Sequence, residues 1–595
     1  MNTRILLAIK SLFFSLVSVT LLVSSAIAGE KTQIRNNASA KNVPLLEFNS
    51  RIFPEVATNG MVVSQESRAT QAGVKVLEQG GNAVDAAVAV GFALAVTLPR
   101  AGNIGGGGFM LIYDNQSKKV NALDYREKAP YQSHRDMFLD EELNVDKRKS
   151  RYSILSSGVP GTVAGLVEAH RKFGRLPFEK VVQPAIELAR RLPVTLSIAQ
   201  SLNARAEYLS RDPETKRIFV KGKGDSWSVG EDFKQQDLAN TLSLIAKSNG
   251  DDFYRGKTAK KIVKFFKESG GLITAKDLQD YRAVWRDPIS TTLGDYQIFA
   301  MPPPSSGGVH LVQLLNIVRQ FPVSKSGPNT AYTTHIKTEA MKFAYADRSK
   351  YLGDPDFVKV PVKSLTDDSY AERIAKRIDL NKVLSPQEIK PGQYFDQESP
   401  QTTHFSVIDG DGNIVSNTYT LNFSFGSGIT VPGTGMLLNN EMDDFSAKPG
   451  VPNAFGLLGG EANAIQPQKR PLSSMTPVIA LNKGEPWLAT GSPGGSRIIT
   501  IVFNFLLNRL AHGMNIAEAT MAPRIHHQWY PDKLQVEKGF PIDTISLLKQ
   551  KGHNVEMRKP WGSLQSIELQ DGVFFGFADP RRPGALAKGY FGKSN

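Results

Sequence analysis

Residues 401–413 read QTTHFSVIDGDGN, and the chain continues as NIVSNTYTL over residues 413–421. Polar and apolar residues alternate on both sides of DGDGN, which predicts two strands joined by a hairpin turn. The DGDGN segment also starts like a calcium loop, but Ile414 stands where such a loop needs Gly and Thr420 where it needs Glu. We therefore predict a turn here, and no other part of the sequence indicates a metal site or a cofactor.

Thr402 begins the first of these two strands. A Thr hydroxyl is a weak nucleophile unless a base lies beside it. If the peptide bond between Gln401 and Thr402 breaks, the new α-amino group becomes that base, because its reference pKa is about 7.7–8.0. Thr is also common in strands, so the residues alone leave two interpretations open: a structural Thr, or a nucleophile released by cleavage.

Residues 1–28 have the pattern of a signal peptide. Basic residues precede an apolar stretch over residues 11–25, and AIA at residues 26–28 supplies the small residues that a signal peptidase reads. The apolar stretch is shorter than the ~20 residues that span a bilayer, so we predict cleavage after residue 28. No later stretch is long and apolar enough to span a membrane, and we expect a soluble, exported protein.

The chain has 595 residues, no Cys and a formal net charge of +14. The absence of Cys excludes disulfides, cysteine nucleophiles, zinc–thiolate sites and Fe–S clusters. A large core must therefore stabilise the exported protein. The positive charge favours anionic partners, but the basic residues are scattered, which argues against nucleic-acid binding.

The pattern of residues 67–109 predicts two helices followed by a glycine-rich segment where backbones cross closely. Residues 67–79 have apolar positions at helical spacing, and Asn82 can cap a following helix, VDAAVAVGFALAVTLP, which is apolar nearly all round and should be buried. GNIGGGGF at residues 102–109 follows a helix and precedes a strand, the reverse of a phosphate-binding loop, so we predict a close crossing of backbones. With the later strands, this predicts a layered α+β fold with sheets between helices.

Several segments resemble gamma-glutamyltranspeptidase. They are QTTHFSVID, NTYTLN, LLNNEMDDFSAKPGVPN, KRPLSSMTP and TGSPGGSR after residue 401, and GNAVDAAVAVGFALAVTLPRAGNIGGGGFM, DYREKAP, MPPPSSGG and AYADRSKYLGDPDF before it. The resemblance extends in order from about residue 50 to the C-terminus. It implies the N-terminal-nucleophile hydrolase fold, a four-layer αββα sandwich. It also implies self-cleavage between Gln401 and Thr402 into a large subunit (29–401) and a small subunit (402–595), which stay associated.

The same resemblance implies a catalytic role for four residues. Thr402 would attack the γ-carbonyl of a γ-glutamyl donor such as glutathione, and Thr420 would hydrogen-bond to it. The amine would leave, and water, an amino acid or a peptide would take the acyl group. Gly494 and Gly495 would donate backbone N–H groups to the oxyanion, a role that suits two glycines whose amides no side chain covers.

The two charged groups of the donor would be bound separately. The α-carboxylate would be bound by Arg126, Ser473 and Ser474, and the fork of Arg suits a carboxylate better than Lys does. The α-ammonium group would be bound by Asp444, Asn422 and Glu441. Family members have either Glu or Gln at position 441. Some bacterial members place a Tyr over the pocket where this chain has Phe455, which can cover the pocket but lacks the hydroxyl that would bond to Asn422.

Two alternatives compete with a gamma-glutamyltransferase or glutathione hydrolase. A glutaryl acylase of the same fold, acting on cephalosporin side chains, would leave Asp444 without a partner, so the presence of Asp444 and Arg126 favours γ-glutamyl donors. A non-catalytic binding protein would stay as one uncleaved chain, and the intact TTH motif argues against it. Resemblance to Gram-negative members favours a periplasmic location, with secretion outside the cell as the alternative.

Overall fold

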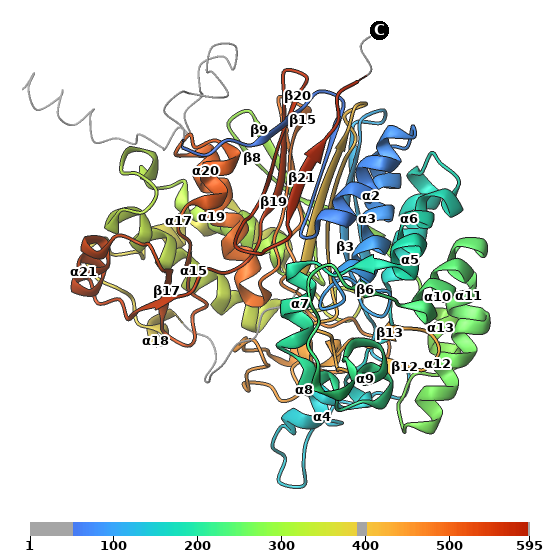
Figure 1. Cartoon of the computed structure of the whole chain (residues 1–595). Coiled ribbons are helices and arrows are strands. Elements are labelled where there is room, and N and C mark those ends of the chain that lie inside the picture. Colours follow the sequence, from blue (N-terminus) through green and yellow to red (C-terminus); the bar gives the residue numbers. More distant parts are fainter. Residues whose placement is uncertain (1–50, 390–401, 593–595) are drawn as a thin grey trace, which may run out of the picture.

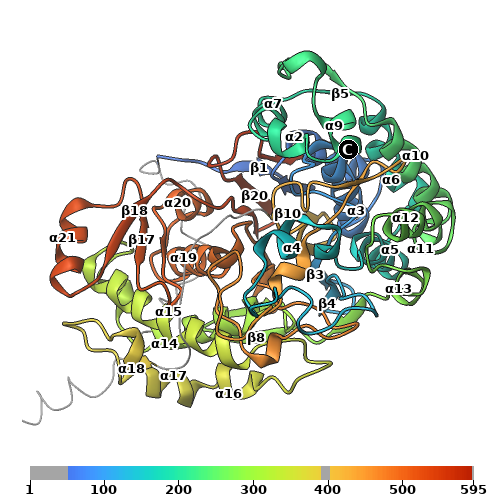
Figure 2. The same ribbon diagram turned by 90° about the horizontal axis from the view of Figure 1, so that it is seen from below.

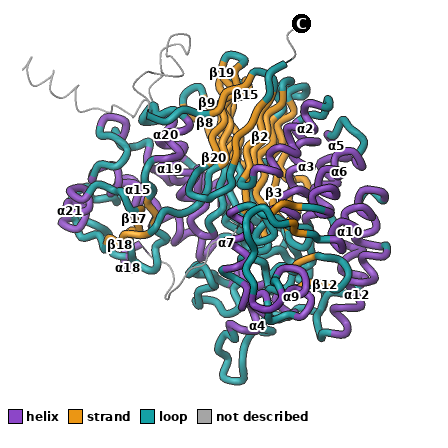
Figure 3. Tube along the Cα trace, viewed as in Figure 1, coloured by secondary structure: helices purple, strands orange, loops and turns teal. Residues whose placement is uncertain are grey.

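The computed structural model describes residues 51–389 and 402–592. The predicted signal peptide and Gln401 lie outside the described residues. Figure 1 shows two β-sheets in the centre of the molecule with helices on both outer sides, and Figure 2 shows the same arrangement from below. Figure 3 separates the central strands from the surrounding helices by colour.

The predicted hairpin forms the middle of the first sheet. β10 (Thr403–Asp409) pairs antiparallel with β11 (Ile414–Thr420), and a carboxylate oxygen of Asp409 accepts the backbone N–H of Asp411 and of Asn413 in the turn. The sheet order is β21-β2-β10-β11-β3-β4-β7. The other strands are β21 (Leu586–Gly589), β2 (Gly60–Ser64), β3 (Gly107–Asp114), β4 (Lys119–Tyr125) and β7 (Val284–Arg286). The hairpin prediction is confirmed.

The second sheet packs face to face against the first. Its order is β1-β20-β19-β15-β14-β9-β8. The strands are β1 (Glu55–Ala57), β20 (Val573–Ala578), β19 (Gln565–Gln570), β15 (Glu485–Thr490), β14 (Val478–Asn482), β9 (Tyr296–Ala300) and β8 (Ile289–Leu293). A separate apolar core fills the space between the sheets, and it includes Phe109, Leu111, Ile408, Ile479 and Ile567. Alternate residues of each strand therefore point into this core.

Helices cover both outer faces. The first sheet is covered by α2 (Ser67–Glu78), α3 (Ala83–Thr97) and α5 (Thr162–Phe173), while α6 (Phe178–Arg190) packs on α3 and α10 (Gln236–Lys247) packs on α6. The second is covered by α14 (Gly307–Val318), α15 (Ala331–Tyr351), α19 (Ile498–Leu510) and α20 (Ile516–Met521). Every residue of α3 is buried, and Asn82 forms a capping box with Asp85, as predicted. The fold is the expected α+β, four-layer αββα sandwich.

Other helices and strands surround these layers. They are α4 (Lys147–Tyr152), α7 (Leu196–Asn203), α8 (Ala206–Leu209), α9 (Pro213–Phe219), α11 (Asp251–Arg255), α12 (Lys257–Glu268), α13 (Ala275–Asp280), α16 (Val362–Thr366), α17 (Asp368–Ala375), α18 (Pro386–Ile389), α21 (Ile542–Gln550), β5 (Leu192–Pro193), β6 (Asp232–Phe233), β12 (Thr430–Val431), β13 (Met436–Leu437), β16 (Ile525–His526), β17 (Leu534–Glu537) and β18 (Val555–Arg558). Among the described residues, no helix combines the length and the apolar character that a membrane span requires.

The glycine-rich segment between α3 and β3 is a close backbone crossing, as predicted. A Cβ on Gly106 would lie 2.0 Å from the carbonyl oxygen of Thr420, so only glycine fits there. The side chain of Asn103 accepts the N–H of Gly106 and donates to the same Thr420 carbonyl at 2.9 Å. This crossing fixes the end of β11, where Thr420 lies.

A buried lysine in α15 makes the stability of the fold depend on pH. Lys337 donates to the side-chain oxygen of Asn504 at 3.0 Å and to the carbonyl of Pro328 at 3.2 Å. Burial lowers the pKa of Lys337 from 10.5 to about 7. Between these two pH values the unfolded chain therefore binds a proton that the folded chain does not, and the free energy of unfolding rises with pH.

Changing Lys337 to Met should remove this contribution. We expect the thermal midpoint of the wild type to rise relative to that of Lys337→Met between about pH 7 and about pH 9, because only the wild type takes up this proton on unfolding. The measurement is a melting curve at each pH. Lys264→Met is the control, since the Lys264 side chain is 74% exposed, and it should follow the wild type. A parallel response of Lys337→Met and wild type would contradict the prediction.

Candidate active site

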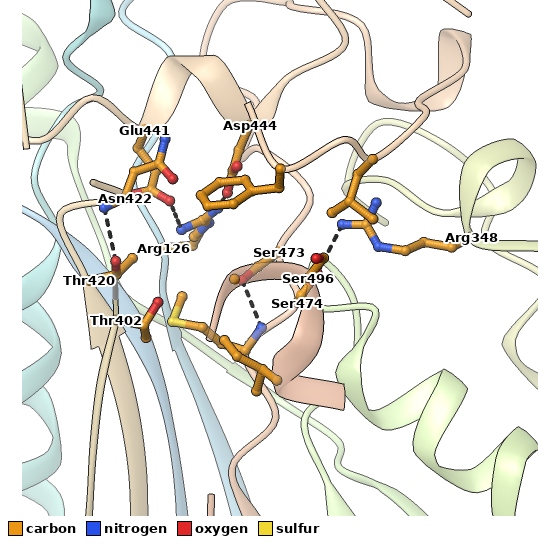
Figure 4. A pocket seen from close by; sticks show the side chains of 15 residues that line it. Arg126, Arg348, Thr402, Thr420, Asn422, Glu441, Asp444, Ser473, Ser474 and Ser496 are labelled. Atoms are coloured by element: carbon orange, nitrogen blue, oxygen red, sulfur yellow. Dashed lines mark hydrogen bonds and ion pairs between the residues drawn. The ribbon is translucent and has the colours of Figure 1, made fainter. Parts of the chain in front are cut away.

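The predicted site residues surround one cavity near the start of β10 and the end of β11 (Figure 4). Those that line it are Thr402, Thr420, Gly495, Arg126, Asn422, Glu441, Asp444, Ser473, Ser474 and Phe455. Gly494 precedes Gly495 in the chain but does not line the cavity, and Gln401 is not among the described residues. Residues from both predicted subunits therefore meet here, because Arg126 lies in the large one.

Strand pairing brings the two threonines together. Thr403 is opposite Tyr419 in the β10–β11 ladder, so Thr402 and Thr420 lie side by side at the end of the hairpin. Thr402 is 6% exposed and borders the cavity. The hydroxyl of Thr420 accepts the backbone N–H of Asn422 at 2.9 Å. The arrangement places two hydroxyl groups at one wall of the cavity.

A glycine turn between β15 and α19 forms another wall. Gly494 and Gly495 have φ values of 150° and 57°, which L-residues with side chains rarely adopt. A Cβ on Gly495 would lie 2.8 Å from the ring of Phe455, so the backbone of this residue is open on the cavity side only because it has no side chain. The hydroxyl of Tyr345 holds the following residue by donating to the carbonyl of Ser496. The turn can therefore present backbone N–H groups toward the cavity.

The guanidinium of Arg126 is buried and paired with acidic residues. Its two terminal nitrogens form ion pairs with Glu441 and Asp444, and Glu127 lies 3.5 Å away. Burial raises the pKa of Glu441 well above its usual value, and burial raises that of Glu127 to about 7, both against the lowering effect of Arg126. The two glutamates therefore do not both carry a full negative charge at neutral pH. The resemblance implied that Arg126 binds one end of a ligand and that Asp444 and Glu441 bind the other, whereas here Arg126 pairs with both acids.

The MPPPSSGG segment, residues 301–308, holds Ser473, and Arg348 contacts Ser474. Ser306 donates its backbone N–H and its hydroxyl to the carbonyl of Ser473, at 2.8 and 2.7 Å. The hydroxyl of Ser473 accepts the N–H of Met475 at 3.1 Å. The hydroxyl of Ser474 accepts from the guanidinium of Arg348 at 3.2 Å. Two parts of the chain that are distant in sequence, residues 301–308 and α15, therefore position the serines.

Arg348 lines the cavity, and the sequence interpretation missed it. It lies in the AYADRSKYLGDPDF segment that contributed to the resemblance, but no residue pattern distinguished it from the many scattered basic residues. The one signal in the sequence that could have indicated Arg348 was its place within this segment of the resemblance. Its proximity to Ser474, 126 positions along the chain, is a result of tertiary packing.

Phe455 lines the cavity, and its role as a cover stays a prediction. Its ring packs 5.9 Å from that of Phe423, and its carbonyl accepts from the side chain of Gln528 at 3.2 Å. Asn422 donates to the carbonyl of Asn440 at 2.9 Å and so has a partner without a lid hydroxyl. The cavity measures only about 20 Å³, room for about one water molecule. A ligand larger than water therefore needs some of the lining residues to move.

One group of possible metal ligands lies in another part of the fold. His335, Glu339 and His553 have ligand atoms within 4.8 Å of one another. The sequence did not indicate this group, because His553 is 218 positions from His335. The two imidazoles hydrogen-bond to each other at 2.8 Å, and Lys342 forms an ion pair with Glu339 at 2.8 Å. Protein partners therefore satisfy these side chains without an ion.

The family model described as Gamma-glutamyltranspeptidase matches residues 69–589. The chain belongs to this family. A relative named glutathione hydrolase proenzyme, from Escherichia coli strain K12, is 53% identical over 540 residues, which cover 90% of this chain and 93% of the relative.

Two solved structures have the same fold as this chain. A cephalosporin acylase from Bacillus halodurans aligns with a TM-score of 0.82 and 31% identity, covering 93% of this chain and 99% of the other. The gamma-glutamyltranspeptidase of Helicobacter pylori aligns with a TM-score of 0.54 and 40% identity, covering 60% of this chain and 100% of the other. The expected family and fold of the N-terminal-nucleophile hydrolases are both confirmed.

Proposed function

We propose that this enzyme is a self-processing gamma-glutamyltransferase and glutathione hydrolase. It would cleave the γ-glutamyl amide of glutathione and related compounds, and pass the γ-glutamyl group to water, amino acids or peptides. The observation that carries the proposal is that Thr402, the glycine turn, and the charged residues Arg126 and Asp444 all border one buried cavity. The similarity to a glutathione hydrolase proenzyme supports the same activity.

Processing activates the nucleophile by supplying its base. Cleavage between Gln401 and Thr402 yields chains 29–401 and 402–595 and frees the α-amino group of Thr402, which then serves as its base. The hydroxyl oxygen attacks the γ-carbonyl carbon of the donor while its proton passes to that amine. The donor C–N bond breaks, and the leaving amine takes the proton. Backbone N–H groups of Gly494 and Gly495 stabilise the oxyanion.

The second half of the reaction regenerates the enzyme. Water or an amine attacks the carbonyl carbon of the ester on Thr402 and gives a proton to the α-amino group. The ester bond then breaks, and the proton returns to the Thr402 oxygen. Thr420 supports the hydroxyl of Thr402 in both halves. In each half, the α-amino group of Thr402 takes up one proton and gives one back, so a single residue supplies nucleophile, base and acid.

The ion pairs of Arg126 explain why a zwitterionic donor fits. The α-carboxylate of the donor would replace Asp444 on the guanidinium, and the α-ammonium group would pair with the released Asp444. No charge is left unpaired by this exchange. A glutaryl donor has the carboxylate but no ammonium group, so it would leave the Asp444 side chain, which is 13% exposed, without a partner. The cavity therefore favours γ-glutamyl over glutaryl donors.

Turnover of matched anilides tests this function. We expect kcat/KM for a γ-glutamyl anilide to exceed that for a glutaryl anilide by about 10²-fold, as removal of one charge-assisted contact to a buried acid predicts. Asp444→Asn should reduce this preference, because the amide needs no cationic partner. The match to a cephalosporin acylase makes a glutaryl acylase the second candidate. Faster cleavage of the glutaryl anilide would favour that candidate.

A gel of the purified protein tests processing, and fractionation of the cells tests location. We expect two polypeptides, with the smaller beginning TTHFSVID, and we expect both in the periplasmic fraction after osmotic shock. A single band would indicate a non-catalytic protein with the same fold. Activity in the culture medium would indicate secretion outside the cell.

A further inference from the structure

Arg348 is a buried cation at the wall of the cavity. It lies near the end of α15, is 5% exposed, and donates from its terminal nitrogen to the hydroxyl of Ser474 and from Nε to the hydroxyl of Ser306 at 3.0 Å. Figure 4 shows its side chain reaching the serines from a different direction than Arg126. Both of its partners are neutral hydroxyl groups.

The charge of Arg348 has no counter-ion among the described residues. No carboxylate oxygen of these residues lies within 4.0 Å of its nitrogens. Arg126, in contrast, is surrounded by Glu127, Glu441 and Asp444. Burial lowers the pKa of Arg348 to about 10, so the guanidinium stays charged at neutral pH. A buried, unpaired charge is costly, and an anion in the cavity would compensate it.

Arg348 also determines where the serine hydroxyls can point. A hydroxyl has one proton to donate. The hydroxyl of Ser474 accepts from Arg348, and that of Ser473 accepts from Met475, so each retains a proton for another acceptor. Through Ser306, Arg348 also supports the carbonyl of Ser473, because the Ser306 hydroxyl accepts from Arg348 and donates to that carbonyl.

We propose that Arg348 is a positioning residue for the α-carboxylate of the donor. It orients the Ser474 hydroxyl toward that carboxylate and adds a second positive charge, in addition to that of Arg126, at the carboxylate-binding end of the cavity. The proposal rests on the proposed function, since it assumes a donor with a carboxylate in this cavity. It assigns Arg348 to recognition of the carboxylate and not to the ammonium group or to the reacting bond.

Three anilides that differ at the α-carbon separate these roles. The γ-glutamyl anilide has both charged groups, the glutaryl anilide has only the carboxylate, and the 4-aminobutanoyl anilide has only the ammonium group. For Arg348→Gln we expect kcat/KM to fall about 10- to 100-fold with the first two, mainly through KM, as loss of a charged hydrogen-bonding partner predicts. With the 4-aminobutanoyl anilide we expect a change of no more than about threefold, within the scatter of mutants without a direct contact. An equal loss with all three donors would overturn the proposal, because a purely structural role affects every donor.

A double-mutant cycle tests whether Arg348 acts through Ser474. The losses of Arg348→Gln and Ser474→Ala should be less than additive if the two residues form one unit. Additive losses would show that Arg348 does not act through this serine. If Arg348→Gln does not fold or process, Ser306→Ala removes only the Nε contact, and we expect a smaller loss with the same two donors. Unchanged KM for both donors in Ser306→Ala would then overturn the proposal.

The wild type separates a failure of this inference from a failure of the proposed function. If the processed wild type does not turn over the γ-glutamyl anilide, the proposed function is wrong. If the wild type turns it over but Arg348→Gln shows no selective loss for donors with a carboxylate, only the role of Arg348 is wrong. Melting curves of the variants confirm that each retains its fold.

Discussion

Changing Thr402 to Val is expected to leave one uncleaved polypeptide and to lower γ-glutamyl turnover by about 10⁴-fold or more, the scale of losing a covalent nucleophile. Val preserves the branched shape of Thr, so the start of β10 should keep its packing while the attacking hydroxyl is lost. The uncleaved chain also lacks a free α-amino group at residue 402, so nucleophile and base disappear together. Gel electrophoresis and a γ-glutamyl anilide assay measure the two effects.

Thr403 provides the matched control for this experiment. Its hydroxyl is buried and has no hydrogen-bond partner among the described residues. Thr403→Val makes the same chemical change one position later, and we expect cleavage and activity to be retained. Cleavage of Thr402→Val at the same bond would show that another residue processes the chain.

Changing Arg126 to Met should reduce both activity and stability. We expect kcat/KM for γ-glutamyl donors to fall by about 10²- to 10⁴-fold, because two charge-assisted hydrogen bonds to the donor carboxylate are lost. We expect the free energy of unfolding to fall by about 3–5 kcal/mol, because Glu441 and Asp444 lose the cation that compensates them in a buried site. Kinetics with the γ-glutamyl anilide and denaturant unfolding measure the two effects.

A second substitution separates stability from recognition. Arg126→Met/Glu441→Gln should recover part of the lost stability, because it removes one uncompensated acid, while activity stays low. Arg135→Met is the control for removing a surface ion pair, since Arg135 and its partner Glu461 are both exposed, and it should change stability by less than about 1 kcal/mol. Retained affinity of Arg126→Met for γ-glutamyl donors would exclude Arg126 as the carboxylate-binding residue.

Local patterns in the sequence predicted the elements that position the site. The alternation around DGDGN predicted the β10–β11 hairpin, and Asn82 predicted the start of α3. The glycines of residues 102–109 predicted a close crossing, which the contact between Gly106 and the Thr420 carbonyl explains. These features depend on residues close in sequence, so periodicity, capping and steric size are sufficient to predict them.

The layering and the choice of site residues came from a different source. Composition and periodicity predicted sheets between helices, and only the resemblance implied four layers and gave roles to Arg126, Asp444 and the serines. Ten of the residues to which the resemblance gave a role line one cavity in the structure. The resemblance could not indicate that Arg126 pairs with Glu441 and Asp444, because such pairing depends on the packed geometry of the cavity.

The sequence by itself determined the hairpin, the caps, the glycine crossing and the threonine that can become a nucleophile. The tertiary structure alone decided that Arg126 is compensated by Glu441 and Asp444, and that Arg348 is not compensated by any described carboxylate. The physical reason is distance along the chain. Arg126 is 315 positions from Glu441, and the energy of a buried charge depends on which distant groups packing brings within a few ångströms of it.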